Sequence, residues 1–379
     1  KEYVDDTLPP KIIEERRKIA LTTNVIQNFK VGKIHKTSKD DIIHSIDFSE
    51  NGNWLASAND DQTIHIYSCE TGMETNIIPS KKYGCNIVKF THSERAVLHT
   101  SNNVNNRENS IRYLDINSNQ YIRYFSGHRD RVVSLAINPS SDSFVSSSLD
   151  KSVRMWSLES SRCVGKINVN GYPVVGVDPD HPMVLPISCD MKTVYLYDIR
   201  KCSQGPFREF TIKNQAVTQT NTHTPAIPPQ NSKIQNLTIS PNSKYMALST
   251  SHEGVIILDA FQGNEIRRIN PHEGHIGNMS EKQKEKMVNY TFETCFSPDN
   301  RFLLIGDYMG YLHTFDVGDN FKAITQKSTF HHVAPLTSIK FNPRKALFAT
   351  ASRSVALWIP SSGHDGQQPI NPTSHPISL

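Results

Sequence analysis

The feature that most constrains the fold of this chain is a short strand-like pattern that recurs seven times. In its clearest copy, LDKSVRMW, Asp150 is followed by Val153, Met155 and Trp156, and this alternation of apolar and polar residues is typical of a half-buried strand. The positions equivalent to Trp156 are Tyr67, Leu114, Tyr197, Leu258, Phe315 and Trp358. Four of the six spacings between successive positions lie between 41 and 47 residues.

A second pattern precedes each copy. Two apolar runs flank a turn rich in Pro, Asn, Asp or Gly, as in LTISPNSKYMALST and TCFSPDNRFLLIG. The two long spacings, of 61 and 57 residues, contain polar insertions at 220–232 and 271–287, which we interpret as loops. Repeats of roughly 40–45 residues with four strands are typical of WD-type blades. The sequence therefore predicts an all-β fold, a seven-bladed WD-repeat β-propeller.

A propeller of this kind must close, because an open edge strand invites aggregation. The last unit supplies only three strands, between residues 336 and 359, and the strand-like residues 30–36 have no partner in their own unit. We therefore expect the N-terminal strand to complete the last blade. The predicted division is an N-terminal extension at 1–29, a propeller at 30–360 and a Pro-, Ser- and Gly-rich tail at 361–379 that we expect to be disordered. The helical-looking end of the extension is expected to pack on the ring or on a partner.

The composition narrows the function classes. No apolar run in the 379 residues approaches the roughly 20 needed for a membrane span, so we expect no membrane partner. The formal net charge of +4 is too mild to imply direct nucleic-acid binding. Six single cysteines without a Cys-x-x-Cys pair indicate reduced thiols.

Three polar or amphipathic residues of the third unit, His128, Asp150 and Trp156, have two possible interpretations. In a WD-type blade such residues form a hydrogen-bonded network with a strand serine, which fixes the turns of the blade. The alternative is a catalytic His-Asp-Ser triad. We favour the structural network, and we expect only this blade to carry the complete set because the others lack the His, the Trp or both.

The remaining sequence contains none of the common phosphate-binding, nucleophile or zinc-protease motifs. Residues 272–275, HEGH, have the wrong spacing to place two histidines on one helical face and indicate a polar loop. His331 and His332 precede a strand and indicate a loop pair or a degenerate Gly-His signal. The acid pairs at 40–41 and 60–61 lie in turns. We therefore expect no catalytic site, no metal and no cofactor.

Five residues are candidates for recognition of a partner. Lys81, Lys82 and Tyr83 precede the first strand of the second blade, and Arg129 and Arg131 precede that of the third. Loops at these places open onto one face of a propeller, where Lys and Arg can pair with phosphate oxygens. We interpret them as a candidate site for a phosphorylated or acidic peptide, with ordinary solvated surface as the alternative.

Across about residues 30–360 the chain resembles one WD-repeat family. The segments that carry the resemblance include SKKYGCNIVKFTH, IRYLDINSNQYIRYFSGH, VYLYDIRKCSQGPF and SIKFNPRKALFATASRSVALW. They are similar to the WD-repeat subunit of COMPASS, the histone H3 lysine methyltransferase complex, a subunit that fungi share with the cleavage and polyadenylation factor. The insertions and the long N-terminal segment depart from that family.

The resemblance implies a nuclear, non-catalytic scaffold. Its partners would be the methyltransferase catalytic subunit and other COMPASS subunits, the phosphorylated tail of RNA polymerase, and subunits of the cleavage and polyadenylation factor, which acts in transcription termination and mRNA 3′-end processing. Two other classes stay open: a substrate-receptor propeller of a ubiquitin ligase, and a propeller enzyme with a site in the central channel.

Overall fold

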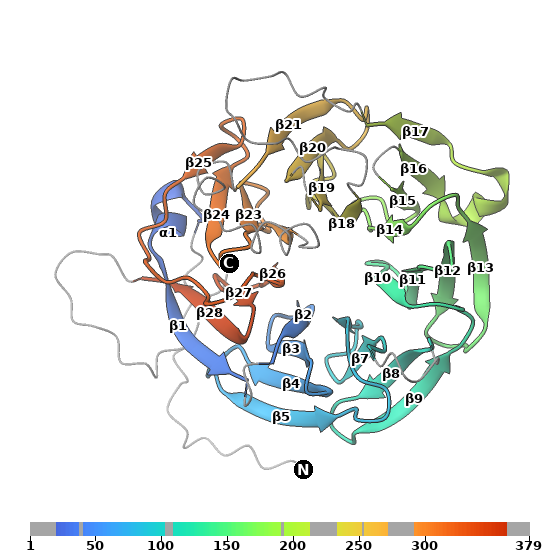
Figure 1. Ribbon diagram of the computed structural model, residues 1–379, viewed down its shortest axis with the longest axis horizontal. Coiled ribbons are helices and arrows are strands. Elements are labelled where there is room, and N and C mark those ends of the chain that lie inside the picture. The colour runs from blue at the N-terminus through green and yellow to red at the C-terminus, as the bar shows by residue number, and fades with distance from the viewer. Residues whose placement is uncertain are drawn as a thin grey trace, which may run out of the picture.

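Seven four-stranded antiparallel sheets stand radially around a common centre and form a ring, as Figure 1 shows. The computed structural model describes residues 20–37, 41–102, 109–190, 193–212, 233–251, 254–271 and 292–361. In six blades the strands follow one another in sequence from the centre outward, whereas the last blade has the order β26-β27-β28-β1. The prediction of a seven-bladed WD-repeat propeller is therefore confirmed.

The first four blades have short, regular strands. Blade 1 contains β2 (Ile43–Phe48), β3 (Trp54–Asn59), β4 (Thr63–Ser68) and β5 (Glu74–Pro79). Blade 2 contains β6 (Val88–Phe90), β7 (Ala96–His99), β8 (Ile111–Asp115) and β9 (Gln120–Phe125). Blade 3 contains β10 (Val132–Ile137), β11 (Ser143–Ser148), β12 (Ser152–Ser157) and β13 (Cys163–Asn168). Blade 4 contains β14 (Pro173–Val175), β15 (Val184–Cys189), β16 (Thr193–Asp198) and β17 (Arg208–Thr211), with the 3₁₀ segment η1 (Ile199–Gln204) before the last strand.

The last three blades complete the ring. Blade 5 contains β18 (Ile234–Ile239), β19 (Tyr245–Thr250), β20 (Val255–Asp259) and β21 (Glu265–Ile269). Blade 6 contains β22 (Thr294–Phe296), β23 (Phe302–Gly306), β24 (Leu312–Asp316) and β25 (Lys322–Ile324). Blade 7 contains β26 (Ser338–Phe341), β27 (Phe348–Ala351), β28 (Ser354–Pro360) and β1 (Phe29–Lys36).

The N-terminal strand closes the ring as predicted. β1 runs antiparallel to β28, from Phe29 opposite Pro360 to Lys36 opposite Ser354. The strand begins at Phe29, one residue earlier than the sequence suggested, because the Phe29 ring is buried and stacks on Phe348 with 5.1 Å between ring centroids. Pairing of the two ends of the chain in one sheet removes the edge that a three-stranded last blade would leave open.

The residues just before β1 pack on the ring. The five-residue helix α1 (Thr23–Gln27) begins after Thr22, whose side chain accepts a hydrogen bond from the Val25 backbone N–H at 3.3 Å. Leu21 and Ile26 are buried in the same apolar cluster as the core residues of blades 6 and 7. The described end of the extension therefore covers the side of the ring, one of the two positions expected for it. It is not a helix that could cross a membrane, and no other helix within the described residues is long and apolar enough to do so.

The core of the molecule lies between the blades rather than within any one of them. Each of the seven apolar clusters joins neighbouring blades. The cluster that joins blade 7 to blade 1, for example, brings Ile43 and Leu55 together with Ala349 and Leu357. Burial of apolar area between neighbouring blades stabilises the fold, and the cluster between blades 7 and 1 forms only when the ring is closed.

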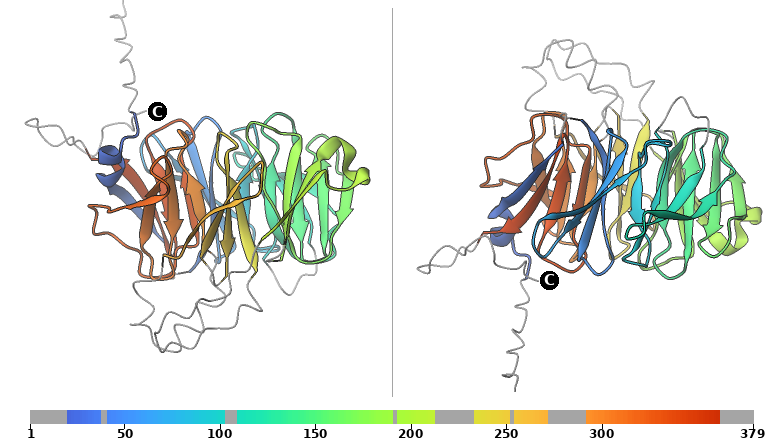
Figure 2. Two further views of the ribbon diagram at one scale, coloured as in Figure 1. Left: turned by 90° about the horizontal axis from the view of Figure 1, so that it is seen from above. Right: turned by 90° about the horizontal axis from the view of Figure 1, so that it is seen from below.

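The two faces of the ring are formed by different loops and turns of the blades. Each blade is an antiparallel meander, so its innermost strand begins on the same face that carries the turn between its second and third strands. His128 precedes the innermost strand of blade 3, and we call this side the His128 face. Figure 2 shows the ring edge-on, with the strands running from one face to the other.

Candidate functional site

The predicted polar network of blade 3 is assembled around one strand hydroxyl. Ser146, on β11, lies 2.8 Å from His128 Nε2, and its Oγ accepts a hydrogen bond from Trp156 Nε1 at 2.8 Å. The other ring nitrogen of His128 lies 2.9 Å from Asp150 Oδ2. The network therefore connects the loop before β10, the second and third strands, and the turn between them.

These contacts define where the protons lie. Burial lowers the pKa of His128, so its ring is neutral near pH 7. The ionised Asp150 carboxylate can only accept, so Nδ1–H of the neutral histidine donates to it and Nε2 is left as an acceptor. The Ser146 hydroxyl therefore donates to His128 Nε2 while its oxygen accepts from Trp156 Nε1. Although burial alone would favour a neutral carboxyl, hydrogen bonds from Ser152, the Arg129 backbone and His128 lower the pKa of Asp150 to about 2. Each polar group has a partner.

The same geometry bears on the alternative of a catalytic triad. A nucleophilic serine must be accessible to a substrate, yet Ser146 is fully buried at 0% exposure and its oxygen already accepts from an indole N–H. The His128 side chain is also almost inaccessible. The arrangement is suited to holding turns in place, and it offers no route for a reacting molecule.

Blade 7 contains a second network of this kind, which corrects the expectation that only blade 3 would combine the His with the Trp. His332 Nε2 lies 2.8 Å from Thr350 Oγ1, which accepts from Trp358 Nε1, also at 2.8 Å. The turn at residues 352–353 has no aspartate, and the Ser354 hydroxyl lies 3.3 Å from the remaining His332 nitrogen instead. Burial lowers the pKa of His332 to about 4. Of the two histidines noted in the sequence, His332 is therefore the degenerate Gly-His signal.

The predicted recognition residues of blade 2 divide into exposed and buried groups. Lys81 and Lys82 are exposed on the loop before β6, and the Lys82 ammonium lies 4.9 Å from the centre of the Tyr83 ring. Tyr83 itself is only 8% exposed, because its ring packs against the guanidinium of the buried Arg112 at 3.6 Å. The buried Tyr83 ring thus anchors the loop to the blade, and the two lysines form the exposed surface of the loop.

The predicted residues of blade 3 are both exposed and lie beside the polar network. The Arg129 backbone N–H donates to Asp150 Oδ2 at 2.9 Å, and the Arg131 backbone N–H donates to Asp130 Oδ1 at 2.7 Å. The network therefore fixes the backbone at Arg129, and the neighbouring Asp130 side chain fixes it at Arg131. The two pairs of cations belong to the loops of neighbouring blades, and both loops open on the His128 face.

Sequence reasoning missed a further group on this face. The ring of Tyr172, on the loop before β14, has the Lys233 ammonium 4.7 Å from its centre and the Lys151 ammonium at 6.0 Å. Lys151 follows Asp150 in the turn of blade 3, and Lys233 precedes β18 of blade 5. Three successive blades thus contribute to one cationic and aromatic group, which we call the Tyr172 cluster. Lys151, Tyr172 and Lys233 lie 21 to 82 positions from one another in the sequence, so only the propeller geometry brings their loops together.

An enzyme with a site in the central channel would carry acidic residues or histidines on or beside the innermost strands. Asp47 on β2 accepts from Lys89 Nζ of the next blade at 2.9 Å, and Glu293 accepts from Lys340 Nζ at 3.1 Å. Each acid is thus paired with a lysine of a neighbouring blade. Among the residues that the structure describes, no group of three His, Cys, Asp or Glu side chains could hold a metal ion. The sequence HEGH at 272–275 lies outside the described residues.

Comparison with known proteins agrees with this architecture. The model of the WD domain, G-beta repeat, matches residues 30–68 and 119–157, and the second match contains the whole blade 3 network.

Relatives match along almost the whole chain. "WD repeat-containing protein 82" of Drosophila melanogaster is 31% identical over 345 residues, which cover 91% of this chain and 98% of the relative. "COMPASS component SWD2" of Saccharomyces cerevisiae is 30% identical over 84% of this chain and 90% of its own length. "Set1 complex component swd2" of Schizosaccharomyces pombe is 27% identical over 83% of this chain and 92% of its own length. The chain therefore belongs to the family of WD-repeat proteins that includes these relatives, two of which are named as COMPASS or Set1 complex components.

Proposed function

We propose that this protein is a non-catalytic scaffold subunit of a COMPASS histone H3 lysine methyltransferase complex in the nucleus. The observation that carries the proposal is the match to relatives named as COMPASS and Set1 complex components over more than four fifths of this chain. A rigid ring whose conspicuous polar network is buried fits the role of holding other subunits better than it fits catalysis. In this proposal, residues 30–360 are the interaction domain, and 1–29 and 361–379 extend from it.

Affinity purification of the tagged full chain, with quantitative mass spectrometry, tests this proposal. We expect the methyltransferase catalytic subunit and its companion subunits at near-stoichiometric amounts. Recovery of cullin-type ligase subunits in their place would favour the substrate-receptor alternative. Purified protein that turns over a substrate without any partner would favour the channel-enzyme alternative.

The same purification addresses a second assembly. The family resemblance implies membership of the cleavage and polyadenylation factor, with a role in transcription termination and mRNA 3′-end processing. We expect its subunits in a fraction that separates by size from the methyltransferase subunits. A single fraction with methyltransferase subunits alone would remove this part of the proposal.

We further propose that the His128 face couples the complex to transcribing RNA polymerase by binding its phosphorylated tail. Arg129 and Arg131 are exposed beside the polar network, and Lys151 and Lys233 flank the half-exposed Tyr172 in the next loops of the ring. A phosphoserine carries roughly −1.5 to −2 charge at pH 7, which such cations can pair with. Because the cations are exposed, the attraction should weaken as salt is raised.

A titration with phosphorylated and unphosphorylated polymerase-tail peptides tests the coupling. We expect the phosphorylated peptide to bind more tightly, and we expect the double change Lys82→Glu and Arg131→Glu to abolish that preference while the melting temperature stays the same. Lys322→Glu on the outer strand of blade 6 is a matched control, because it reverses an exposed cation at a distant place in the ring. Equal affinity for the two peptides would make these residues ordinary solvated surface.

A further inference from the structure

The outer edge of blade 6 is incomplete. The short strand β25 pairs with only three residues of β24, namely Thr314, Phe315 and Asp316. In blade 3, by contrast, the outer strand pairs with the third strand from Ser152 to Trp156. Within the described residues, Leu312 and His313 at the start of β24 therefore have no strand on their outer side.

The backbone of Leu312 faces this open side. Asp307 N–H donates to the Tyr311 carbonyl at 3.1 Å, and the Tyr311 N–H donates back to Asp307 Oδ1 at 2.8 Å, so Tyr311 directs its backbone toward β23. Backbone groups alternate in direction along an antiparallel strand. The N–H and C=O of Leu312 consequently point outward, in line with those of Thr314, which β25 does engage.

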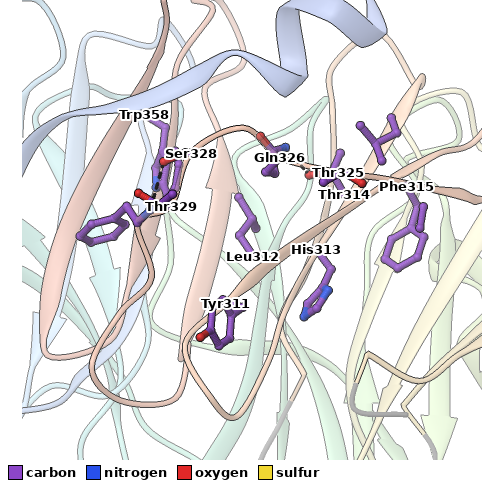
Figure 3. A pocket seen from close by; sticks show the side chains of 13 residues that line it. Tyr311, Leu312, His313, Thr314, Phe315, Thr325, Gln326, Ser328, Thr329 and Trp358 are labelled. Carbon is purple, nitrogen blue, oxygen red and sulfur yellow. Dashed lines mark hydrogen bonds between the residues drawn. The ribbon is translucent and has the colours of Figure 1, made fainter. Parts of the chain in front are cut away.

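A pocket of about 370 Å³ lies along this edge. Figure 3 shows it between β24 and the segment that follows β25, with Tyr311, Leu312 and Phe315 on one side and Trp358 with Ser328 and Thr329 on the other. The segment leaves the blade because Lys327 N–H donates to the Gln27 carbonyl at 3.0 Å, which draws it toward α1. The divergence of the segment from β24 opens the pocket.

Several residues that line the pocket carry polar side chains, and Gln326 is one of them. The Gln326 amide donates to Thr314 Oγ1 at 2.8 Å, and its Oε1 is buried with no hydrogen-bond partner among the described residues. A buried acceptor without a partner favours a ligand that brings a hydrogen-bond donor to it. None of the residues that line the pocket is acidic, and Lys327 is exposed beside it.

We propose that this edge binds an extended peptide segment of a partner protein, which adds to β24 at Leu312 and places one apolar side chain in the pocket, with an acidic residue beside Lys327. An unpaired strand edge is complementary to an extended backbone, and an adjacent apolar pocket selects one side chain of the added strand. The absence of acids in the lining and the exposed lysine favour a peptide with negative charge. This site is separate from the His128 face and does not depend on which complex the protein joins.

Selection of random 12-residue phage-displayed peptides on the immobilised full chain, followed by fluorescence polarisation with the synthesised winners, tests the proposal. We expect winners that combine an apolar residue with a nearby Asp or Glu. Leu312→Pro removes the outward N–H, a change that strand edges tolerate, and should weaken binding at least about tenfold. Thr329→Trp, which fills the pocket from an exposed position, should do the same, whereas Ser161→Trp in an exposed turn of blade 3 should change the affinity less than about twofold.

The two variants separate loss of peptide binding from loss of folding. If Leu312→Pro lowers the melting temperature strongly, Thr329→Trp decides alone, because it leaves the strand unchanged. Failure to enrich any peptide, or winners whose affinity survives Thr329→Trp, would overturn the proposal. Enrichment only after removal of residues 1–19 would overturn it too, because the chain's own segment would then be the occupant.

Discussion

Removal of one hydroxyl group should reveal whether the blade 3 network stabilises the ring. Ser146→Ala leaves the Trp156 indole N–H and His128 Nε2 without the partner that each has in the structure. Both groups are buried, and each unsatisfied buried polar group costs about 1–3 kcal/mol. We therefore expect the free energy of unfolding to fall by about 2–6 kcal/mol, although the side chain loses only one atom.

Equilibrium unfolding in urea, followed by tryptophan fluorescence and circular dichroism together, measures this change. Thr350→Val provides a matched test in blade 7, because it removes the hydroxyl that joins His332 to Trp358 while it keeps the shape of the side chain. Ser161→Ala, at an exposed turn, should stay within about 0.5 kcal/mol of the unchanged protein. If Ser146→Ala were as stable as that control and one activity were lost instead, the network would be a site and our interpretation of it would be wrong.

Two further predictions concern stability. Deletion of residues 1–36 removes β1 together with the buried Leu21, Ile26 and Phe29, so it should cause aggregation and a marked fall in melting temperature. Deletion of residues 1–19 should change neither the solubility nor the melting temperature. Similar melting curves for the two truncations would argue against closure by β1. Burial also lowers the pKa values of four histidines, to about 3 for His99, to about 4 for His332 and in the same direction for His35 and His128. The unfolded chain then binds protons that the folded chain excludes. The contribution of these histidines to stability should therefore be fully present above about pH 7 and be lost on acidification from about pH 6.5 toward pH 4, by up to about 1.4 kcal/mol per pH unit for each histidine. Urea midpoints from pH 7.5 to 5 measure this slope, and His332→Gln should make it shallower; an unchanged slope would mean that His332 is protonated in the folded state.

The seven-bladed ring could be predicted from the sequence because the strand pattern of one blade recurs along the chain. Seven alternating strands with similar spacing leave few architectures open, and a last unit with three strands requires a fourth from elsewhere in the chain. The closing strand could therefore be located to within one residue. Its first residue, Phe29, was missed because only the three-dimensional stacking on Phe348 shows that the ring belongs to the core.

The network of blade 7 was missed for a local reason. Its turn has only two residues, 352–353, so the aspartate and the regular spacing that identify the blade 3 turn are both lost. Thr350 and Trp358 nevertheless make the same hydrogen bond as Ser146 and Trp156. Sequence spacing is a weak guide where a hairpin has changed length, because the contact depends on register and not on residue count.

The candidate binding surfaces were the least predictable part of the molecule. Tyr83 looked like a surface residue from its polar neighbours, but its contact with Arg112 depends on how the loop before β6 packs on β8 of the same blade. The Tyr172 cluster draws on three blades, and the open edge of β24 depends on where β25 ends and where the following segment is anchored. Such features arise from contacts between distant segments, which no short motif encodes.

The central claim is that this ring supports histone H3 methylation as a scaffold. Depletion of the protein from its own cells, with mass spectrometry of methylated and unmethylated histone H3 tails, tests that claim most directly. We predict that methylation falls on depletion and that the unchanged chain restores it. The Ser146→Ala variant should restore methylation only under conditions in which its ring is folded. Histone H3 methylation that is unchanged after depletion would contradict the account.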